Sequence, residues 1–263
     1  MNTQVLNPSF TASAPRRQLR AYLEETRCEA LRMLRNPALA FPITLMPVAL
    51  YAIFAVFIAG EAIDKEPSLG VFMFAAFSIM ATSMPALFGI GTSLAMEREI
   101  GLLRLKRAQP APTGSWLVAK IACGVGFGIL SYLPILGVAL ATGKLPLDGG
   151  AITGMSLVMI ASSIPFCAMG LMVGSLVSGN AAAGYANLIY LPGCYLSGMF
   201  FPLPKSMHWQ TPIWPQFHVE QLAMHAAGYE KFQYVPVTMA LAGTIGFTVL
   251  FSAVAIWRLA RKG

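Results

Sequence analysis

The chain has 263 residues, of which 56% are hydrophobic and 11% are charged; its net charge is +7 and its mean hydropathy +0.65. Soluble domains carry about 25% charged residues, so this composition argues against a soluble domain. Several uncharged runs reach the roughly 20 residues that a helix needs to cross a hydrocarbon core of about 30 Å. They do not alternate apolar and polar residues as barrel strands do. The composition therefore predicts a helical membrane protein.

Residues 1–37 are polar and basic, and we expect a cytoplasmic tail followed by an amphipathic helix over Pro15–Asn36. Apolar residues recur every three or four positions from Leu19 to Leu34, and arginines occupy much of the rest. A basic amphipathic helix beside a span tends to lie in the membrane interface. Two interpretations stay open: a docking helix for a cytoplasmic partner and an anchor on the lipid surface.

Residues 38–257 are predicted to form an all-α, polytopic domain with six transmembrane helices. Their expected ranges are Ala38–Gly60, Leu69–Met96, Ser115–Thr142, Gly150–Val177, Ala181–Phe201 and Val235–Trp257. Residues 258–263 form a short basic tail.

The cations predict the orientation of these spans. With six spans, thirteen Lys or Arg lie on the side of the two termini and four on the other side. Cytoplasmic segments carry the excess of Lys and Arg, so we expect both termini in the cytoplasm. Because the cations sit at the ends of spans, nucleic acid is not expected as a partner.

A charged loop, residues 97–114, separates the second and third predicted spans. It opens with Glu97, Arg98 and Glu99, and more cations follow from Arg104 to Arg107. We expect it to carry one short helix at the membrane face. The bland alternative is a solvated loop that only obeys the charge rule for cytoplasmic segments.

The segment 202–234, before the last span, is too long for a tight link and too apolar for a solvated loop. Trp and Tyr favour the membrane interface, and Trp209 and Trp214 lie in this segment just after Pro202. We predict an outer re-entrant hairpin with a short helix at Gln216–Ala227. A metal site at His208, His218 and His225 is a weaker alternative to polar tips on an interfacial helix.

Polar side chains also enter the fifth span, and they have two interpretations. Asn187, Tyr190, Tyr195 and Ser197 either bond to each other within the bundle or line a transport path. The pairs Gly124 with Gly128 and Gly170 with Gly174 have the G-x-x-x-G spacing that lets helices approach closely. We predict helix packing there.

No residue of this chain is predicted to be catalytic, to bind a cofactor or to hold a metal. The sequence contains no G-x-x-x-x-G-K-[ST] loop for nucleotide phosphates. No His lies within a predicted span to activate a Ser or Cys nucleophile. An enzyme is therefore not expected.

Three features together resemble the permease subunit of type-2 ABC (ABC-2) exporters. The charged loop is similar to that family's E-x-E-x-G-x-L-x-x-L pattern followed by prolines and a lysine, here Glu97 to Leu105, then Pro110, Pro112 and Lys120. The fifth span ends Leu196-Ser197-Gly198-Met199-Phe200-Phe201-Pro202, like the family's L-S-G-x-x-F-P segment. The basic helix before the first span matches the family's connecting helix.

The resemblance implies a bacterial inner-membrane exporter in which two permease subunits pair, each with one cytosolic ATPase subunit. ATP and Mg would bind the ATPase, not this chain. The short helix of the charged loop would be the coupling helix, with the coupling residues Glu97, Arg98, Glu99, Gly101, Leu102 and Leu105. Glu97 and Glu99 would offer anionic contacts to the ATPase, and Gly101 would permit close approach. Leu102 stands where the family often has a small polar residue.

An apolar bundle with short outer loops leans towards an amphipathic or lipophilic substrate, such as a drug, antibiotic, lipid or glycolipid. Two other functions stay open. An ion- or proton-coupled carrier would need a titratable group in its path, and the sequence offers only Lys120 near one end. A non-transporting scaffold or sensor subunit would tolerate charge reversal in the loop.

Overall fold

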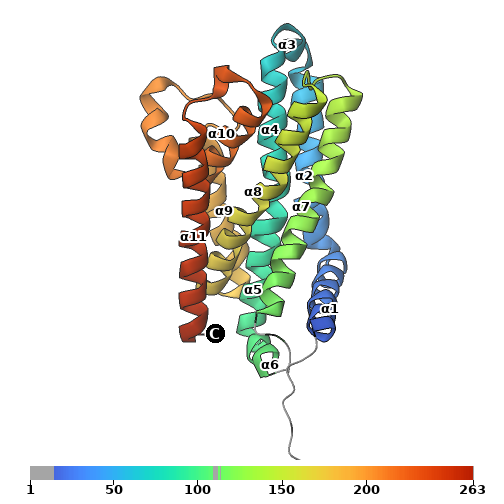
Figure 1. Cartoon of the computed structure of the whole chain (residues 1–263), viewed down its shortest axis with the longest axis vertical. Coiled ribbons are helices and arrows are strands. Elements are labelled where there is room, and N and C mark those ends of the chain that lie inside the picture. The colour runs from blue at the N-terminus through green and yellow to red at the C-terminus, as the bar shows by residue number, and fades with distance from the viewer. Residues whose placement is uncertain (1–14, 109–111, 113, 263) are drawn as a thin grey trace, which may run out of the picture.

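Long helices run side by side along the length of the molecule (Figure 1). The computed structural model describes residues 15–108, 112 and 114–262, so the predictions for residues 1–14 and for Pro110 lie outside it. Its elements are α1 (Pro15–Leu34), α2 (Pro37–Tyr51), η1 (Ala52–Ile58), α3 (Gly60–Lys65), α4 (Pro67–Met84), η2 (Pro85–Gly89), α5 (Ile90–Glu99), α6 (Leu102–Ala108), α7 (Ser115–Ala141), α8 (Gly149–Leu176), α9 (Gly179–Leu196), η3 (Lys205–Ile213), α10 (Pro215–Ala227), η4 (Glu230–Phe232) and α11 (Val237–Lys262).

Five helices among the described residues are long and apolar enough to cross a membrane, which confirms the all-α polytopic class. They span Ala40–Ile58, Pro67–Glu99, Ser115–Ala141, Gly149–Leu176 and Val237–Arg261. The fifth predicted span, Ala181–Phe201, corresponds to α9, which returns along the bundle (Figure 1) and packs against α5 and α8. It is not among the five because Asn180, Asn187 and three glycines dilute its apolar character.

The continuous helix formed by α4, η2 and α5 is the centre of the bundle. In its most apolar stretch 89% of the residues are buried, against 11% in α11. The wide π-helical turn η2 begins at Pro85, a residue that has no N–H to donate within a helix. This central helix therefore joins the charged loop directly to the core of the bundle.

Glycines bring α8 against the central helix. A Cβ added to Gly170 would lie 2.7 Å from the carbonyl oxygen of Ala86, and one on Gly174 would lie 2.6 Å from that of Gly91. On α7, a Cβ on Gly124 would lie 2.8 Å from Cys167 Sγ. The packing predicted for the glycine pairs is confirmed.

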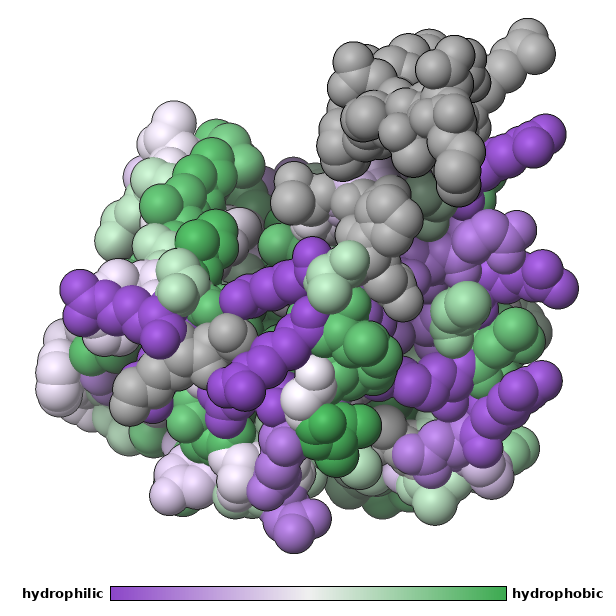
Figure 2. Space-filling model, turned by 90° about the horizontal axis from the view of Figure 1, so that it is seen from below, coloured by the Kyte–Doolittle hydropathy of each residue, from purple (hydrophilic) through white to green (hydrophobic). Residues whose placement is uncertain are grey.

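The three basic segments of the sequence meet at one end of the bundle. This basal end holds α1, α6 and the C-terminal end of α11, whereas α3 and α10 lie at the opposite, distal end (Figure 1). Hydrophilic side chains gather over the basal face (Figure 2). The arrangement is the one that six passes through the bundle require.

The predicted outer hairpin forms a folded cap at the distal end. Its short helix is α10, as predicted, and α10 packs against α4, α8, α9 and α11. The chain leaves α9 earlier than predicted, because Gly198 adopts a positive φ of 85° and Ser197 Oγ accepts a 3.3 Å hydrogen bond from the N–H of Met199. This turn explains the Ser-Gly pair noted in the sequence.

Two further boundaries differ from the predictions. Glu97, Arg98 and Glu99 belong to the last turn of α5 rather than to a loop. The predicted tail continues α11 as helix as far as Lys262.

Candidate functional site

The predicted coupling residues lie where α5 turns into α6. Gly101 makes the turn with φ 76°, a backbone conformation that only glycine adopts readily, and its N–H donates to the carbonyl of Arg98 at 3.2 Å. No described atom lies within 4 Å of the position that its Cβ would take. Within the chain, glycine is needed here for the turn, and the close approach of a partner that Gly101 would permit stays a prediction.

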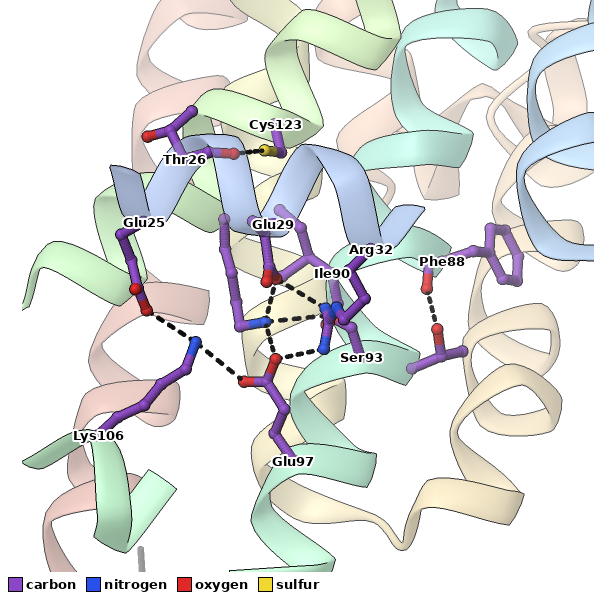
Figure 3. A network of polar contacts seen from close by, with 12 residues as sticks. Glu25, Thr26, Glu29, Arg32, Phe88, Ile90, Ser93, Glu97, Lys106 and Cys123 are labelled. Carbon is purple, nitrogen blue, oxygen red and sulfur yellow. Dashed lines mark hydrogen bonds and ion pairs between the residues drawn. The ribbon is translucent and has the colours of Figure 1, made fainter. Parts of the chain in front are cut away.

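Glu97 points into the protein and joins an ion-pair cluster with α1, α6 and α7 (Figure 3). Its Oε1 accepts from Lys120 Nζ at 2.9 Å and also from Arg32, while its Oε2 lies 4.0 Å from Lys106 Nζ. Glu29 on α1 accepts from the same two partners, Lys120 and Arg32. We call Glu25, Glu29, Arg32, Glu97, Lys106 and Lys120 the basal cluster.

The basal cluster balances three carboxylates with three cations. Lys120 is completely buried and Glu97 is 2% exposed, and buried charges persist only when they are paired. Burial lowers the pKa of Lys106, but its hydrogen bond to Glu25 and the charges of Glu97, Glu25 and Glu29 outweigh this and raise the pKa overall. The expected direct contact of Glu97 with an ATPase is thus corrected, because its side chain is enclosed by its own chain.

Arg98 and Glu99 bind the turn that joins α8 to α9. Arg98 donates to the carbonyl of Val177 at 2.5 Å and to that of Ser175, at the C-terminal end of α8. Glu99 Oε2 accepts from the N–H of Gly179 at 2.8 Å, at the first residue of α9. A cation at a helix C-terminus and an anion at an N-terminus both complement the helix dipole. Glu99, too, is therefore engaged within the chain.

Helix α6 is also tied to the last helix of the chain. Arg107 Nη2 donates to the carbonyl of Leu259 in α11 at 3.1 Å. The α5–α6 junction therefore bonds to the basal ends of α1, α7, α8, α9 and α11.

One side of α6 remains open at the basal surface. Leu103 is buried and Leu102 is partly buried, whereas Leu105 is 61% exposed and Ile100, just before α6, is 76% exposed. Arg104 is exposed beside them. Ile100, Arg104 and Leu105, which we call the α6 face, offer apolar contact and positive charge to a partner.

Comparison with known proteins identifies the family. The family model described as "ABC-2 type transporter" matches residues 23–226, which is more than half of the chain. The chain belongs to the ABC-2 type transporter family. It is similar to the protein named "Putative transport permease YvfS" of Bacillus subtilis (strain 168), with 24% identity over 200 residues, covering 74% of this chain and 80% of that protein. The family assignment makes this chain a transporter permease.

Two of the four predicted path residues of the ABC-2 permease are open and two are enclosed. Asn187 is exposed, and Tyr195 is 56% exposed. Tyr190 is buried, with its hydroxyl 2.6 Å from Ser83 Oγ, and Ser197 is buried in the turn after α9. For Tyr190 and Ser197 the structure favours the alternative of bonding within the bundle.

Tyr195 borders an apolar groove in the distal half of the permease. The groove has a volume of about 230 Å³ and lies between α2, η1, α4 and the end of α9. Its walls include Phe54, Phe77, Leu191 and Phe201. A groove of this kind accepts an apolar chain or ring.

The segment 202–234 of the permease uses its histidines as ties to the backbone. The Nε2 atoms of His208, His218 and His225 lie 2.8, 2.9 and 2.8 Å from the carbonyls of Leu203, Pro212 and Val235. Within the described residues no three His, Cys, Asp or Glu groups come together as metal ligands. Trp214 Nε1 donates to Gln210 Oε1 at 2.9 Å, while Pro202 and Trp209 stay exposed.

Sequence reasoning missed the partners of Glu97. Lys120 was the signal, because it is the single charged residue of α7, and an ionisable residue inside a span has a partner by default. Its partner Glu29 lies 91 positions earlier. Only the packing of α1 along α7 brings these residues together.

Proposed function

We propose that this chain is the permease subunit of an ATP-driven exporter, coupled through α6 to a separate cytosolic ATPase. ATP and Mg are then held by the ATPase. The observation that carries the proposal is that the α5–α6 junction bonds to the basal ends of five other helices. A push on α6 is therefore shared by nearly the whole bundle.

The α6 face supplies the proposed contact with the ATPase. Ile100 and Leu105 are exposed large apolar residues next to the exposed cation Arg104. An apolar centre with a charged rim is typical of stable protein interfaces. The displacement of α6 then passes to the other helices through the side chains of Glu97, Arg98 and Glu99. Gly101 sets the angle between α5 and α6.

A second permease subunit is proposed to cover the exposed side of α9. Asn187 is exposed there, among Leu188, Leu191 and Tyr195. A polar amide that faces lipid is costly, and polar residues in membrane helices often bond across helix interfaces. The partner is either a second copy of this chain or a related one.

The substrate class is proposed from the distal groove. Its walls are apolar apart from the Tyr195 hydroxyl, which favours an amphipathic or lipophilic molecule over an ion or a sugar. Asn187 and Tyr195 share the open side of α9 with this groove. They are the two predicted path residues that we retain.

The charge distribution supports a basal end in the cytoplasm of a bacterium, with the chain in the inner membrane and both termini cytoplasmic. Hydrophilic side chains gather over the basal face (Figure 2), the end of the bundle to which α1, α6 and the end of α11 bring their cations (Figure 1). Positive segments of membrane proteins remain on the cytoplasmic side. The distal hairpin then faces outward, where an exporter releases its substrate.

The first experiment separates docking from coupling. The chain is co-expressed with an ABC ATPase encoded beside it, and the complex is purified and reconstituted in lipid. We expect Leu105→Asp to abolish co-purification of the ATPase, because it places a charge in the α6 face. Leu23→Asp, at a residue of α1 that is 60% exposed, is the matched control and is expected to keep the complex.

The same preparation tests the transport mechanism. Glu97→Gln is expected to keep the complex and lose substrate-stimulated ATP hydrolysis. Equal loss of the ATPase in Leu105→Asp and Leu23→Asp would contradict docking specifically at the α6 face. If no ATPase co-purifies and a pH gradient alone drives flux, the carrier alternative replaces this proposal.

Disulfide trapping tests the second subunit. Leu188→Cys on α9 and Ile245→Cys on α11 have similar exposure, 68% and 60%. In a chain whose four native cysteines are replaced, we expect an oxidised dimer for Leu188→Cys and a monomer for Ile245→Cys. Cross-linking of both to the same extent would contradict the α9 interface.

A further inference from the structure

Helix α10 carries a carboxyl group that the proposed coupling does not use. Glu220 is 3% exposed and lies in the part of the hairpin that packs against α4, α8, α9 and α11. Its carboxyl group has no hydrogen bond or ion pair among the described residues, and its Oε1 is fully enclosed. A buried carboxylate without a countercharge is strongly disfavoured.

The other polar side chains of α10 each have at least one hydrogen-bond partner, in contrast to Glu220. Gln221 donates to the carbonyl of Phe232 at 3.1 Å and accepts from the N–H of Tyr234 at 2.7 Å. Gln216 Nε2 lies 3.4 Å from the carbonyl of Tyr190, and His218 and His225 contact backbone carbonyls. Among these bonds the one from Gln216 reaches α9, whereas the others tie α10 to the rest of the hairpin. Within the described residues, Gln216 Oε1 and His218 Nδ1 are also buried without a partner, but Glu220 is the side chain of α10 with no hydrogen bond at either oxygen.

No cation faces Glu220 from the elements around it. Helix α4 has no titratable residue, α8 has only Cys167, and α11 has only the cations of its basal end. The titratable groups of α9 are Tyr185, Tyr190, Cys194 and Tyr195. The remaining neighbours along the hairpin are Lys205, His208, His218, His225, Tyr229, Glu230, Lys231 and Tyr234.

None of these groups pairs with Glu220. Lys231 is paired with Glu66, and the imidazoles contact carbonyls. Tyr234 is the group coupled to it electrostatically: burial, and then the charge of Glu220, raise the pKa of the Tyr234 hydroxyl. Burial raises the pKa of Glu220 to about 8.

We propose that Glu220 is a proton-binding site that locks the outer hairpin onto the bundle, and that loss of this proton releases α10. The packing of α10 against α4, α8, α9 and α11, together with the bond from Gln216 to Tyr190, forms the lock, and a neutral Glu220 is the condition for closing it. Deprotonation places an unpaired charge between four helices, so water must reach Glu220 and α10 must lift. The hairpin therefore closes the distal end when Glu220 is protonated and opens it when Glu220 is ionised.

The direction of the pH effect follows from the raised pKa. An exposed carboxyl has a pKa of 4.5 and Glu220 in the closed hairpin about 8. Below pH 4.5 both forms are protonated and the closed hairpin is fully favoured. Between these values only the open hairpin loses its proton, so closure weakens as pH rises and levels off above about pH 8.

Hydrogen–deuterium exchange of the full chain in lipid nanodiscs tests the proposal. The exchange of α10 amides, corrected for intrinsic rates, is compared at about pH 6 and about pH 8, and we expect protection to fall by roughly tenfold or more. Glu220→Gln, which mimics the protonated side chain, is expected to remove the fall. Glu230→Gln, at an exposed glutamate of the same hairpin, is expected to retain it.

Three results would overturn the proposal. The first is unchanged α10 protection between the two pH values in the unaltered chain, a measurement that needs no variant. The second is an equal fall in Glu220→Gln. The third is an equal fall in the apolar variant Glu220→Met, which serves as the second test if the glutamine variant does not purify.

Discussion

Glu97 and Lys120 form a buried ion pair, with Lys120 Nζ 2.9 Å from Glu97 Oε1, that joins the end of α5 to the start of α7. Both residues flank α6, so the pair closes the base of the α5–α6–α7 segment. Helix α1 adds one charge to each partner: Glu29 pairs with Lys120, and Arg32 pairs with Glu97. This places the connecting helix, the charged loop and the third span in one electrostatic unit (Figure 3).

The first prediction concerns the charge balance of that unit. Glu97→Gln leaves Lys120 buried with one carboxylate fewer, and removing one partner of a buried pair costs about 3 kcal/mol of unfolding free energy. Lys120→Met leaves the opposite imbalance and is expected to cost a similar amount. The double variant restores the charge balance of the cluster. Its loss of unfolding free energy should therefore be smaller than the sum of the two single losses by at least about 1 kcal/mol.

Thermal unfolding of the purified permease in detergent measures this cycle. The matched control is the exposed pair of Glu24 and Arg27 on α1, whose charges are 3.6 Å apart. Exposed ion pairs contribute little to stability. The coupling energy between Glu24→Gln and Arg27→Met should therefore be below about 0.5 kcal/mol. Additive losses at Glu97 and Lys120 would show that the cluster does not act as a unit.

The second prediction concerns the turn before α6. Gly101→Ala is expected to destabilise the permease by roughly 1–2 kcal/mol, because a Cβ is strained at φ 76°. Gly101→Asn should cost less, since Asn tolerates this conformation better than Ala does. The control is Gly126→Ala, at a glycine of α7 that has no neighbour within 4 Å and no positive φ. It should leave stability unchanged or raise it.

Substrate-stimulated ATP hydrolysis of the complex gives a second measurement of the turn. If Gly101 sets the angle of α6, Gly101→Ala lowers stimulation while ATPase binding is kept. If Gly101→Ala keeps both the stability and the substrate-stimulated ATP hydrolysis of the unaltered chain, the turn is not required for coupling.

The sequence predicted what depends on hydrophobic length and local turn chemistry. The spans, the short helix in the charged loop and α10 all follow from apolar runs with polar or proline boundaries. The early end of α9 was also readable, because Ser197-Gly198 is a typical helix end. Local reasoning is sufficient for such features.

The inward direction of Glu97 was not predictable in this way. Glu97 and Glu99 are two residues apart, and both looked like surface charges of a cytoplasmic loop. Their directions depend on where α1 and the α8–α9 turn pack. Long-range packing also determines that Tyr190 is a core residue bonded to Ser83, 107 positions away.

The third prediction tests Arg98 as a cap of α8. Arg98→Met removes its hydrogen bonds to the carbonyls of Ser175 and Val177, and bonds to charged groups contribute about 1.5–3 kcal/mol. We expect faster hydrogen exchange at the α8–α9 turn and weaker ATPase stimulation. Arg104→Met, at an exposed arginine of α6, should leave exchange at that turn unchanged. The same increase in both variants would instead indicate a general effect of lost charge.

The fourth prediction concerns the contact between α8 and the central helix. Gly170→Ala places a Cβ 2.7 Å from the carbonyl oxygen of Ala86 and 2.8 Å from that of Leu87. Backbone atoms cannot rotate away, so the helices must separate, and overpacking of this kind costs about 1–3 kcal/mol. We expect a lower unfolding temperature and lower yield of folded permease.

Gly246→Ala is the matched control for that contact. Gly246 also lies within a membrane helix, α11, but no described atom lies within 4 Å of its Cβ position. Alanine forms helix better than glycine by about 1 kcal/mol, so this variant should equal or exceed the unaltered chain in stability. If Gly170→Ala is as stable as Gly246→Ala, α8 does not need glycine to approach the central helix.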